Sequence, residues 1–331
     1  MTQTQLNGPQ SEPVLREALG EGSHRLLLLA STGGHLAQLV RMAEAQGASA
    51  DSVWVTFDSP QSRSLLHDRN VVWVDYVAPR DFKALAQAHA DLRTKVDPTS
   101  VSGVVSTGAG LALAGFAWAR EHRLPAAYIE SVSRTGGPSL TGRIVRTFRL
   151  ARTFTQHATW ANRHWQLVPS VMRQFERVDD SSARDDRPLR VLVTLGTIRP
   201  YRFDALVDGM MSILRHDDEV IWQLGETTRT DLPGRCNTLM GADEFLDEAR
   251  AADVVVTHAG VGTILQLLDN GISPVVVPRR KIRGEHVDDH QMQIFGLLGD
   301  AGIAVPAEVN DLSRDTLLIA ANTSTISKAT A

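Results

Sequence analysis

The chain has 331 residues, of which 43% are hydrophobic and 22% charged, and its formal net charge is −4. This length is typical of two domains at roughly 100–200 residues each. The acidic balance argues against a protein that binds nucleic acid over its whole surface, so we predict no nucleic-acid partner. The single cysteine, Cys236, cannot form an internal disulfide, which is typical of a reducing cytoplasm.

The first segment carries no recognisable targeting signal. Residues 1–23 are polar and lack the basic start and long apolar core of a signal peptide, so we interpret them as a mobile tail. The apolar run that follows, Leu26 to Ala30, is far shorter than the roughly 20 residues of a membrane-spanning helix. We expect a cytoplasmic protein that is soluble or lies on a membrane surface.

The first predicted strand, Arg25 to Ala30, runs into the turn S-T-G-G-H-L and then a helix. Gly33 and Gly34 form the turn, and His35 stands at the start of the helix. The dinucleotide fingerprint G-x-G-x-x-G is not met. From the pattern alone, His35 is either a residue facing a ligand or a satisfied structural histidine.

Strand and helix patterns then alternate, which predicts a parallel sheet with helices on both faces. The predicted strands are 53–57, 71–74, 101–106 and 125–129, and the predicted helices are 81–96 and 111–120. Gly108 lies in the turn after the third of these strands, and Glu130 and Ser131 follow the fourth. Glu130 is either a general base, as Glu and His both can be, or a residue that caps the next turn or pairs with an arginine.

A basic stretch follows, with no acidic residue between positions 131 and 173. Arg143, Arg146, Arg149 and Arg152 recur at every third position, with Phe148 among them, so on a helix they form a band. Such a band favours contact with an anionic membrane surface. The alternative is a helix packed on the sheet with a solvated basic face.

Residues 178–189 are polar and contain a proline, which indicates an interdomain linker. The strand 191–194 then leads into a further glycine turn at Gly196 and Thr197. Further predicted elements are a helix at 204–214, a strand at 220–224 that holds Gln223 and precedes Gly225, a helix that ends at 251, and a last short helix at 312–320.

The stretch from 253 to 293 contains another strand that is followed by a glycine turn. The buried run 254–256 precedes His258, Gly260, Gly262 and Thr263, which lead into a helix and then a strand at 274–278. Small residues let a backbone approach a ligand, and the first N–H groups of a helix bind phosphate.

A charged segment directly follows that last strand. Arg279, Arg280 and Lys281 lie where ligands bind in open α/β sheets, and basic groups suit a diphosphate. The next residues combine carboxylates, imidazoles and an amide, which suit sugar or ribose hydroxyls. These residues are Glu285, His286, Asp289, His290 and Gln291. The alternative is a solvated, charged loop that leads into a helix.

Several of these motifs resemble those of one glycosyltransferase family. The motifs HAGVGT, VVVPRR and GEHVDDHQ resemble the donor-binding domain of glycosyltransferases related to MurG. The motifs STGGHL, STGAG and YIES resemble the acceptor-binding half of MurG and of the dolichol-linked chitobiose-forming GlcNAc transferase. In the latter the two halves are separate proteins, whereas here they are fused. The version GEHVDDHQ resembles the bacterial exopolysaccharide branch most.

The resemblance implies the GT-B fold: α/β, with two Rossmann-like, doubly wound domains facing each other across a cleft. It assigns an acceptor-binding domain to 24–177 and a UDP-sugar-binding domain to 190–320. It also implies an inverting hexosyltransferase of the EC 2.4 class, acting at the inner face of the cell membrane. The donor would be UDP-GlcNAc, UDP-glucuronate or UDP-glucose, and the acceptor a saccharide linked to a polyprenyl diphosphate.

The sequence patterns and the resemblance together assign roles to residues. The candidate general bases are His35 and Glu130, and the acceptor-binding residues are Gly33, Gly34, Gly108 and Ser131. The donor-binding residues are Gly196, Thr197, Gln223, Gly225, His258, Gly260, Gly262, Thr263, Arg279, Glu285, His286, Asp289, His290 and Gln291. The membrane-contacting residues are Arg143, Arg146, Phe148 and Arg149. The chain has no Asp-x-Asp sequence, so we expect no metal, and no cofactor besides the UDP-sugar co-substrate.

Three alternatives compete with this interpretation. A UDP-GlcNAc 2-epimerase shares the two-domain shape and the nucleotide sugar but needs no lipid. A nicotinamide-dependent oxidoreductase would require G-x-G-x-x-G and an acid near the end of the second strand, and neither pattern is met. A nucleotide-sugar sensor without catalytic activity is compatible with the sequence.

Overall fold

A computed structural model describes residues 24–45, 48–78, 80–179, 187–196, 199–286 and 290–328. The predicted tail 1–23 and most of the predicted linker lie outside this part of the chain. The chain divides into two compact units, residues 1–171 and 172–331. The division falls after Val171, ahead of the domain boundary that the sequence predicts at 177.

The N-terminal unit is built on a parallel sheet of seven strands in the order β3-β2-β1-β4-β5-β6-β7. The strands are β1 (Leu26–Ala30), β2 (Val53–Phe57), β3 (Asn70–Val74), β4 (Gly103–Gly108), β5 (Ala126–Ile129), β6 (Arg152–Thr155) and β7 (Trp165–Leu167). Every residue of β1 and β2 is buried, as expected for central parallel strands that are covered on both faces.

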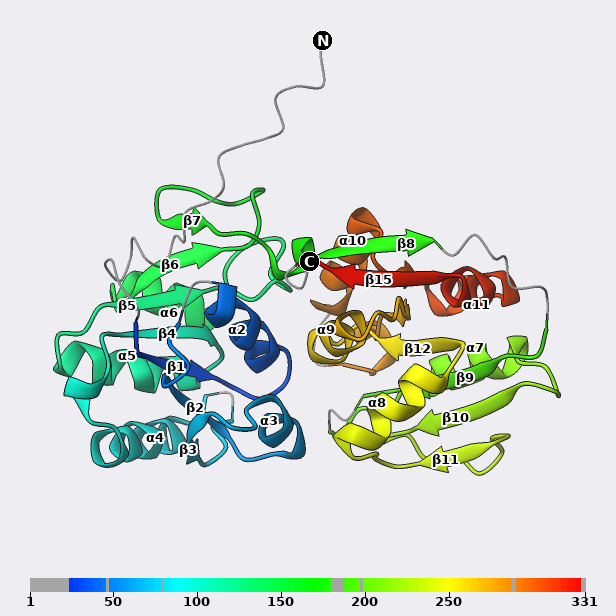
Figure 1. Ribbon diagram of the computed structural model, residues 1–331, viewed down its shortest axis with the longest axis horizontal. Coiled ribbons are helices and arrows are strands. Elements are labelled where there is room, and N and C mark those ends of the chain that lie inside the picture. The colour runs from blue at the N-terminus through cyan, green and yellow to red at the C-terminus, as the bar shows by residue number, and fades with distance from the viewer. Residues whose placement is uncertain are drawn as a thin grey trace, which may run out of the picture. The chain divides into compact units, whose positions relative to one another are not determined.

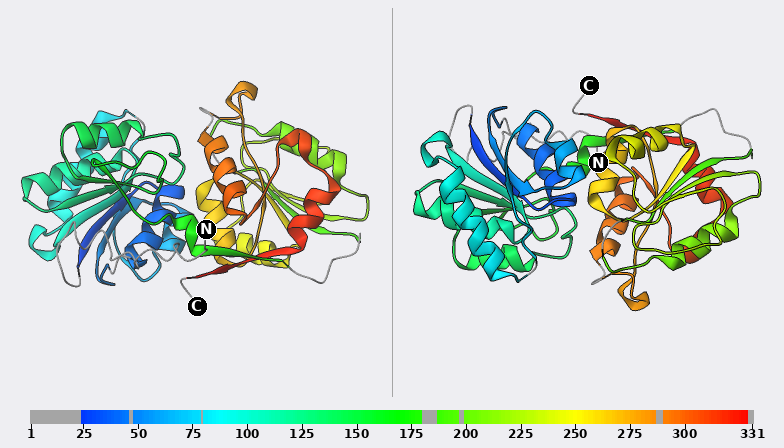
Figure 2. Two further views of the ribbon diagram at one scale, coloured as in Figure 1. Left: turned by 90° about the horizontal axis from the view of Figure 1, so that it is seen from above. Right: turned by 90° about the horizontal axis from the view of Figure 1, so that it is seen from below.

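Helices cover both faces of this sheet, as Figure 2 shows. They are α2 (Gly34–Ala45), α3 (Pro60–Leu65), α4 (Phe82–Lys95), the short η1 (Pro98–Ser100), α5 (Leu111–Glu121) and α6 (Leu140–Thr147). Leu27 and Leu29 of β1 belong to the same core cluster as Leu92 of α4 and Phe116 of α5. Helix α4 begins after Asp81, whose side chain accepts a hydrogen bond from the Ala84 N–H.

The predicted helical band of arginines is wrong in part. Helix α6 ends at Thr147, so only Arg143 and Arg146 lie on it. Arg149 follows in a left-handed conformation with φ 50°, and Arg152 opens β6. The helix stops because the Leu150 N–H returns to the Val145 carbonyl (3.0 Å), which turns the chain into the next buried strand.

The C-terminal unit has a parallel sheet of six strands in the order β11-β10-β9-β12-β13-β14 and a separate antiparallel pair, β8 and β15. The strands are β8 (Phe175–Asp179), β9 (Arg190–Thr194), β10 (Glu219–Gln223), β11 (Arg235–Asn237), β12 (Val254–His258), β13 (Val275–Val277), β14 (Val305–Pro306) and β15 (Thr323–Ser327). Figure 1 shows β15 beside β8, which joins the end of the chain to the start of this unit. The sequence analysis predicts neither strand of this pair.

Two layers of helices cover this second sheet. The helices are α7 (Asp204–Ile213), α8 (Ala242–Ala251), α9 (Val261–Asp269), α10 (His290–Ala301) and α11 (Arg314–Ala321), with the short η2 (Val171–Gln174), η3 (Lys281–Arg283) and η4 (Val309–Asp311). Leu206 of α7 and Leu317 of α11 share one core cluster. Phe245 of α8 and Leu267 of α9 belong to another. The predicted class, two doubly wound α/β units with parallel sheets, is confirmed.

Within the described ranges, no helix is long and apolar enough to cross a bilayer.

Candidate functional site

His35 lies at the carboxyl end of β1, in the first turn of α2. Its Nδ1 is 2.7 Å from the Thr107 carbonyl oxygen, and the Thr107 hydroxyl donates to the His35 carbonyl at 2.7 Å. A carbonyl oxygen only accepts hydrogen bonds, so Nδ1 must carry the ring proton. The other nitrogen, Nε2, then keeps its lone pair, as a general base requires.

The surroundings of His35 keep its imidazole neutral. Burial lowers its pKa, the hydrogen bond to Thr107 opposes this change, and the charge of Arg134 lowers the pKa further. Gly108 supplies the space: its φ is 109°, and a Cβ there would lie 3.1 Å from the ring carbon Cε1. The turn after β4 therefore requires glycine both for its backbone conformation and for the imidazole.

The predicted acceptor-binding residues follow neighbouring strands of the same sheet. Gly33 and Gly34 follow β1, Gly108 ends β4, and Ser131 comes after β5, which pairs with β4. The Gly33 N–H donates to Gln61 Oε1 at 2.8 Å. The structure thus brings these turns together at one edge of the sheet, where open α/β folds bind ligands.

A buried amide holds two of these segments in place. The Gln38 side chain of α2 donates to the Ser131 hydroxyl at 3.1 Å and accepts from the Val132 N–H at 2.8 Å. Gln38 is fully buried, so breaking this pair would leave unsatisfied polar atoms in the core.

Glu130 has the geometry of the capping alternative rather than that of an accessible base. Its side chain is 1% exposed, and it accepts hydrogen bonds from the Ser139 N–H (2.9 Å), the Ser139 hydroxyl (3.0 Å) and the Tyr128 hydroxyl (3.1 Å). Burial raises the pKa of Glu130, and the bonds from Ser139 and Tyr128 oppose that change. Ser139 is the N-cap of α6, so Glu130 anchors the start of that helix. His35 is the better-placed base.

His258 occupies the corresponding edge of the C-terminal sheet, at the end of β12. Its ring lies between two glycine turns: a Cβ at Gly196 would be 2.6 Å from Cε1, and one at Gly260 would be 2.2 Å from Nε2. Burial lowers the pKa of His258 to about 3, with the charges of Arg279 and His286 acting in the same direction. The imidazole is therefore neutral at pH 7.

Helix α9 begins at this imidazole. Gly260 is its N-cap, and no side chain in the described part of the chain caps it. Gly262 and Thr263 lie in the first turn, whose N–H groups have no acceptor within the helix. A phosphate suits such a helix start.

Arg279 does not offer its guanidinium to a diphosphate as predicted, because the side chain is fully buried. It donates to the carbonyl oxygens of Tyr201 (3.0 Å), Glu285 (3.0 Å) and Leu195, and it lies over the Phe203 ring at 5.1 Å. Burial lowers its pKa to about 10. Its role in this structure is to hold three loops together.

The polar groups that follow Arg279 also bind the protein itself. Glu285 is 4% exposed and accepts from the Arg280 N–H (2.8 Å) and from Arg283 Nε (2.9 Å). Gln291 Oε1 accepts from the Arg279 N–H at 2.9 Å. The Glu285 oxygens and Gln291 Oε1, predicted to bind sugar hydroxyls, thus shape the loop.

Two further donor-site predictions can be placed. His286 is half-buried and stacks on Tyr201, with ring centroids 6.0 Å apart. Thr197, Asp289 and the His290 side chain lie outside the described part of the structure.

Gln223 and Gly225 position the loop before α8. The Gln223 amide donates to the Thr194 hydroxyl at 2.9 Å and accepts from the Met240 N–H at 3.0 Å, while the Gly225 N–H donates to the Thr238 carbonyl. Both residues therefore fix the backbone of the segment from Thr238 to Met240.

Sequence reasoning missed the residues that organise these sites. Thr107 fixes the tautomer of His35, Ser139 binds Glu130, and Tyr201 and Phe203 frame the segment after β13. Thr107 could have been found, since it precedes Gly108 at the end of a strand predicted to lie at the same edge. No local pattern links Tyr201 or Phe203 to Arg279, because that contact spans 76 to 78 positions of the chain. Among the described residues, no group of three or more His, Cys, Asp or Glu side chains is arranged to hold a metal.

Parts of this chain are similar to known glycosyltransferases. Residues 190–328 match the Glycosyltransferase family 28 C-terminal domain. The NDP-glycosyltransferase YjiC of Bacillus subtilis is 24% identical over 151 residues, which are 42% of this chain and 37% of that protein. The chain therefore spans little more than a third of the length of this curated relative.

Two solved structures share the fold over most of the chain. MurG of Acinetobacter baumannii matches with 19% identity and a TM-score of 0.50, covering 90% of this chain and 89% of that one. A structure from Listeria monocytogenes, described as a UDP-N-acetylglucosamine 2-epimerase, matches with 12% identity and a TM-score of 0.52, covering 91% and 92%. The chain thus has the GT-B fold, and its C-terminal unit matches a glycosyltransferase family 28 domain.

Proposed function

We propose that this protein is a glycosyltransferase that moves a sugar from a nucleoside diphosphate sugar to an acceptor hydroxyl. The observation that carries the proposal is the match of residues 190–328 to the Glycosyltransferase family 28 C-terminal domain. The geometry of that unit supports it: two glycine turns and the start of α9 meet around His258. A helix start of this kind suits the diphosphate of a donor.

His35 is the general base of the proposed reaction. The acceptor hydroxyl attacks the anomeric carbon, the new C–O bond forms, and the bond from that carbon to the diphosphate oxygen breaks. The nucleoside diphosphate leaves with the bonding electrons, and the hydroxyl proton passes to Nε2 of His35. The hydrogen bond from Nδ1 to Thr107 fixes the tautomer that this step needs. A lone base of this kind contributes roughly 10²–10⁴-fold to the rate.

The donor is a UDP-sugar, namely UDP-GlcNAc, UDP-glucuronate or UDP-glucose, and the acceptor a polyprenyl-diphosphate-linked saccharide used in exopolysaccharide or envelope glycan synthesis. The resemblance of the sequence motifs supports these finer assignments. The exposed Phe148 beside the exposed Arg143 and Arg149 supports contact with an anionic membrane surface at the inner face of the cell membrane. Transfer proceeds without a metal or cofactor, because the N–H groups at the start of α9 bind the diphosphate.

The test is turnover with a panel of UDP-sugars, measured as UDP release with and without a lipid-linked acceptor. We expect UDP release that depends on the acceptor, persists in EDTA and is lost in His35→Asn. The second candidate, a UDP-GlcNAc 2-epimerase, is favoured by the fold shared with the Listeria structure. It predicts conversion of free UDP-GlcNAc to its 2-epimer without any acceptor. That result, with no glycoside product, would replace the proposed activity.

A further inference from the structure

A second cluster of charged residues lies away from the turns described above. Arg146, Arg149, Arg152, Arg163 and His164 line a hollow of about 210 Å³, together with Ala151, Thr153 and Gln166. Arg152 and Thr153 begin β6, and His164 immediately precedes β7. The hollow is therefore at the amino-terminal end of these parallel strands, whereas His35 and Gly108 lie at the carboxyl edge of the same sheet.

Three of the four arginines that line this hollow are not paired with a carboxylate of the described residues. No acidic residue occurs between positions 131 and 173. Arg146, Arg149 and Arg163 form no ion pair with any residue in the described ranges. In the C-terminal unit, by contrast, Arg229 pairs with both Asp208 and Asp231.

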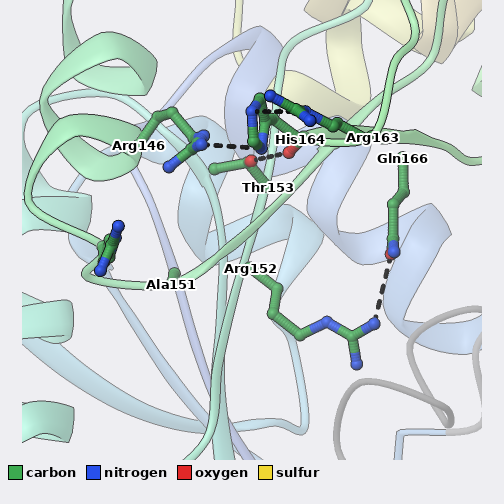
Figure 3. Close-up of a pocket in the computed structure, with 8 residues that line it drawn as sticks. Arg146, Ala151, Arg152, Thr153, Arg163, His164 and Gln166 are labelled. Carbon is green, nitrogen blue, oxygen red and sulfur yellow. Dashed lines mark hydrogen bonds between the residues drawn. The ribbon is translucent and has the colours of Figure 1, made fainter.

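The contacts of His164 contain more donors than acceptors. Arg146 reaches its Nδ1 at 2.7 Å, and Arg163 Nε reaches its Nε2 at 3.1 Å, as Figure 3 shows. A guanidinium only donates, and a neutral imidazole has one nitrogen that accepts. Only one of the two contacts can therefore be a hydrogen bond, and the other sets N–H against N–H. An oxyanion in the hollow would accept from both guanidinium groups and remove this conflict.

We propose that this hollow is a binding site for a phosphate group, held by Arg146 and Arg163 with support from Arg149. Guanidinium groups match the geometry of phosphate oxygens and bind them through paired hydrogen bonds. The volume is smaller than the roughly 300–1,000 Å³ of pockets for drug-sized ligands, so it suits a phosphate or diphosphate rather than a whole nucleotide sugar. The inference does not rest on the proposed transferase activity.

The same chemistry has two sources: a soluble phosphate compound or the headgroup of a phospholipid. Two exposed apolar residues are sequence neighbours of lining residues: Phe148, 62% exposed, precedes Arg149, and Leu167, 48% exposed, follows Gln166. Apolar side chains next to basic groups suit a lipid surface. Binding assays with soluble and vesicle-bound phosphate separate the two sources.

The first experiment measures binding of inorganic pyrophosphate to the full chain by calorimetry at constant ionic strength. We expect saturable binding that weakens about tenfold or more in Arg146→Gln and in Arg163→Gln, because each removes hydrogen bonds to a charged group. The matched control is Arg143→Gln, which changes an exposed arginine of the same helix that does not line the hollow. Melting curves without phosphate verify folding, and Arg146→Lys and Arg163→Lys serve where a Gln variant does not fold.

The second experiment uses phosphatidylcholine vesicles that carry phosphatidic acid or, at equal surface charge, phosphatidylserine. Preference for phosphatidic acid, lost in Arg146→Gln and displaced by pyrophosphate, identifies a lipid headgroup as the ligand. Pyrophosphate binding without vesicle binding identifies a soluble phosphate compound. Two results would overturn the proposal: no saturable pyrophosphate binding, or an equal loss of pyrophosphate binding in Arg143→Gln and Arg146→Gln, which indicates diffuse attraction to a basic surface. Neither measurement involves turnover, so failure here leaves the proposed activity untouched.

Discussion

His35 and His258 occupy the same kind of position in their units, but different groups surround the two rings. Each lies at the carboxyl edge of a parallel sheet, against a glycine with positive φ at the end of a neighbouring strand: Gly108 for His35 and Gly196 for His258. In each case the ring occupies the space that a side chain on the glycine would fill. The difference lies in the groups around the two rings.

At His35, the hydrogen bond from Nδ1 to the Thr107 carbonyl is the second-largest influence on the pKa and opposes burial. At His258, the charges of Arg279 and His286 reinforce burial, and the hydrogen bond to Thr194 is the weakest influence. The pKa of both rings is lowered, but only at His258, where it is about 3, do neighbouring charges outweigh the hydrogen bond. In the proposed reaction, the same motif holds the general base in one unit and a neutral packing group in the other.

The largest expected effect comes from replacing His35. Asn at this position can still donate to the Thr107 carbonyl but has no nitrogen in the place of Nε2. We expect His35→Asn to lower the rate of sugar transfer roughly 10²–10⁴-fold while donor affinity stays within a factor of about two. His258→Asn is the matched variant in the other unit, and its effect should appear in donor affinity rather than in the rate. Comparable rate losses in both variants would contradict the division of roles.

Arg279 offers the next test, because its charge adds to the effect of burial in lowering the pKa of His258. Arg279→Met keeps a long side chain but leaves the carbonyl oxygens of Tyr201, Glu285 and Leu195 without their donor. At about 1 kcal/mol for each lost bond, the free energy of unfolding should fall by about 3 kcal/mol, measured by urea titration. Lys281→Met, in the exposed segment two residues later, should change it by less than about 0.5 kcal/mol. Equal stability of both variants would mean that Arg279 does not hold the loops.

Gly108 and Gly196 should differ in how much an alanine substitution destabilises the protein. A Cβ at Gly108 lies 3.1 Å from His35, so the ring must give by a few tenths of an ångström, whereas at Gly196 the contact is 2.6 Å and the ring must move. Both positions also have positive φ, which costs about 1–3 kcal/mol for other residues. We expect Gly196→Ala to destabilise by about 1 kcal/mol more than Gly108→Ala in thermal melts. The reverse order would show that the His258 ring is the looser of the two.

The sequence predicts the strands and turns of both sites better than the roles of the side chains in them. Buried apolar strands and the glycine turns after them are local patterns. The strands that precede His35 and Glu130, and the strand that ends at His258, are therefore predicted to within about two residues. The sequence does not predict the pair β8 and β15, because short, mostly polar strands that join distant segments show no local pattern.

The roles of the charged residues depend on burial, which the sequence does not display. Arg279, Glu285 and Gln291 have the residue types of a ligand site, yet each is buried and binds protein atoms. Glu130 likewise stands where a base is expected and instead anchors α6. Each of these four side chains binds a loop that is irregular or far away in the sequence. Hydrophobic periodicity in the sequence therefore does not reveal the contact.

The smallest effect, and the most direct comparison of the two rings, is the dependence of stability on pH. The pKa of His258 is about 3 in the folded protein and about 6.5 in an unfolded chain. Above pH 6.5 neither state binds a proton at this ring, so the ring adds no dependence. Between pH 6.5 and pH 3 only the unfolded chain takes up the proton. Stability therefore falls as the pH falls, by up to about 1.4 kcal/mol per pH unit from this group.

Urea unfolding of the wild type, His258→Asn and His35→Asn between pH 4 and pH 7 measures this contribution. His258→Asn should flatten the curve most. His35→Asn should flatten it less, because the bond to Thr107 offsets part of the burial that lowers the pKa of His35. His157, whose pKa burial also lowers, contributes equally to all three proteins and cancels in the differences. If His35→Asn flattens the curve as much as His258→Asn, the two rings have the same electrostatic surroundings, and the division into base and packing group loses its physical basis.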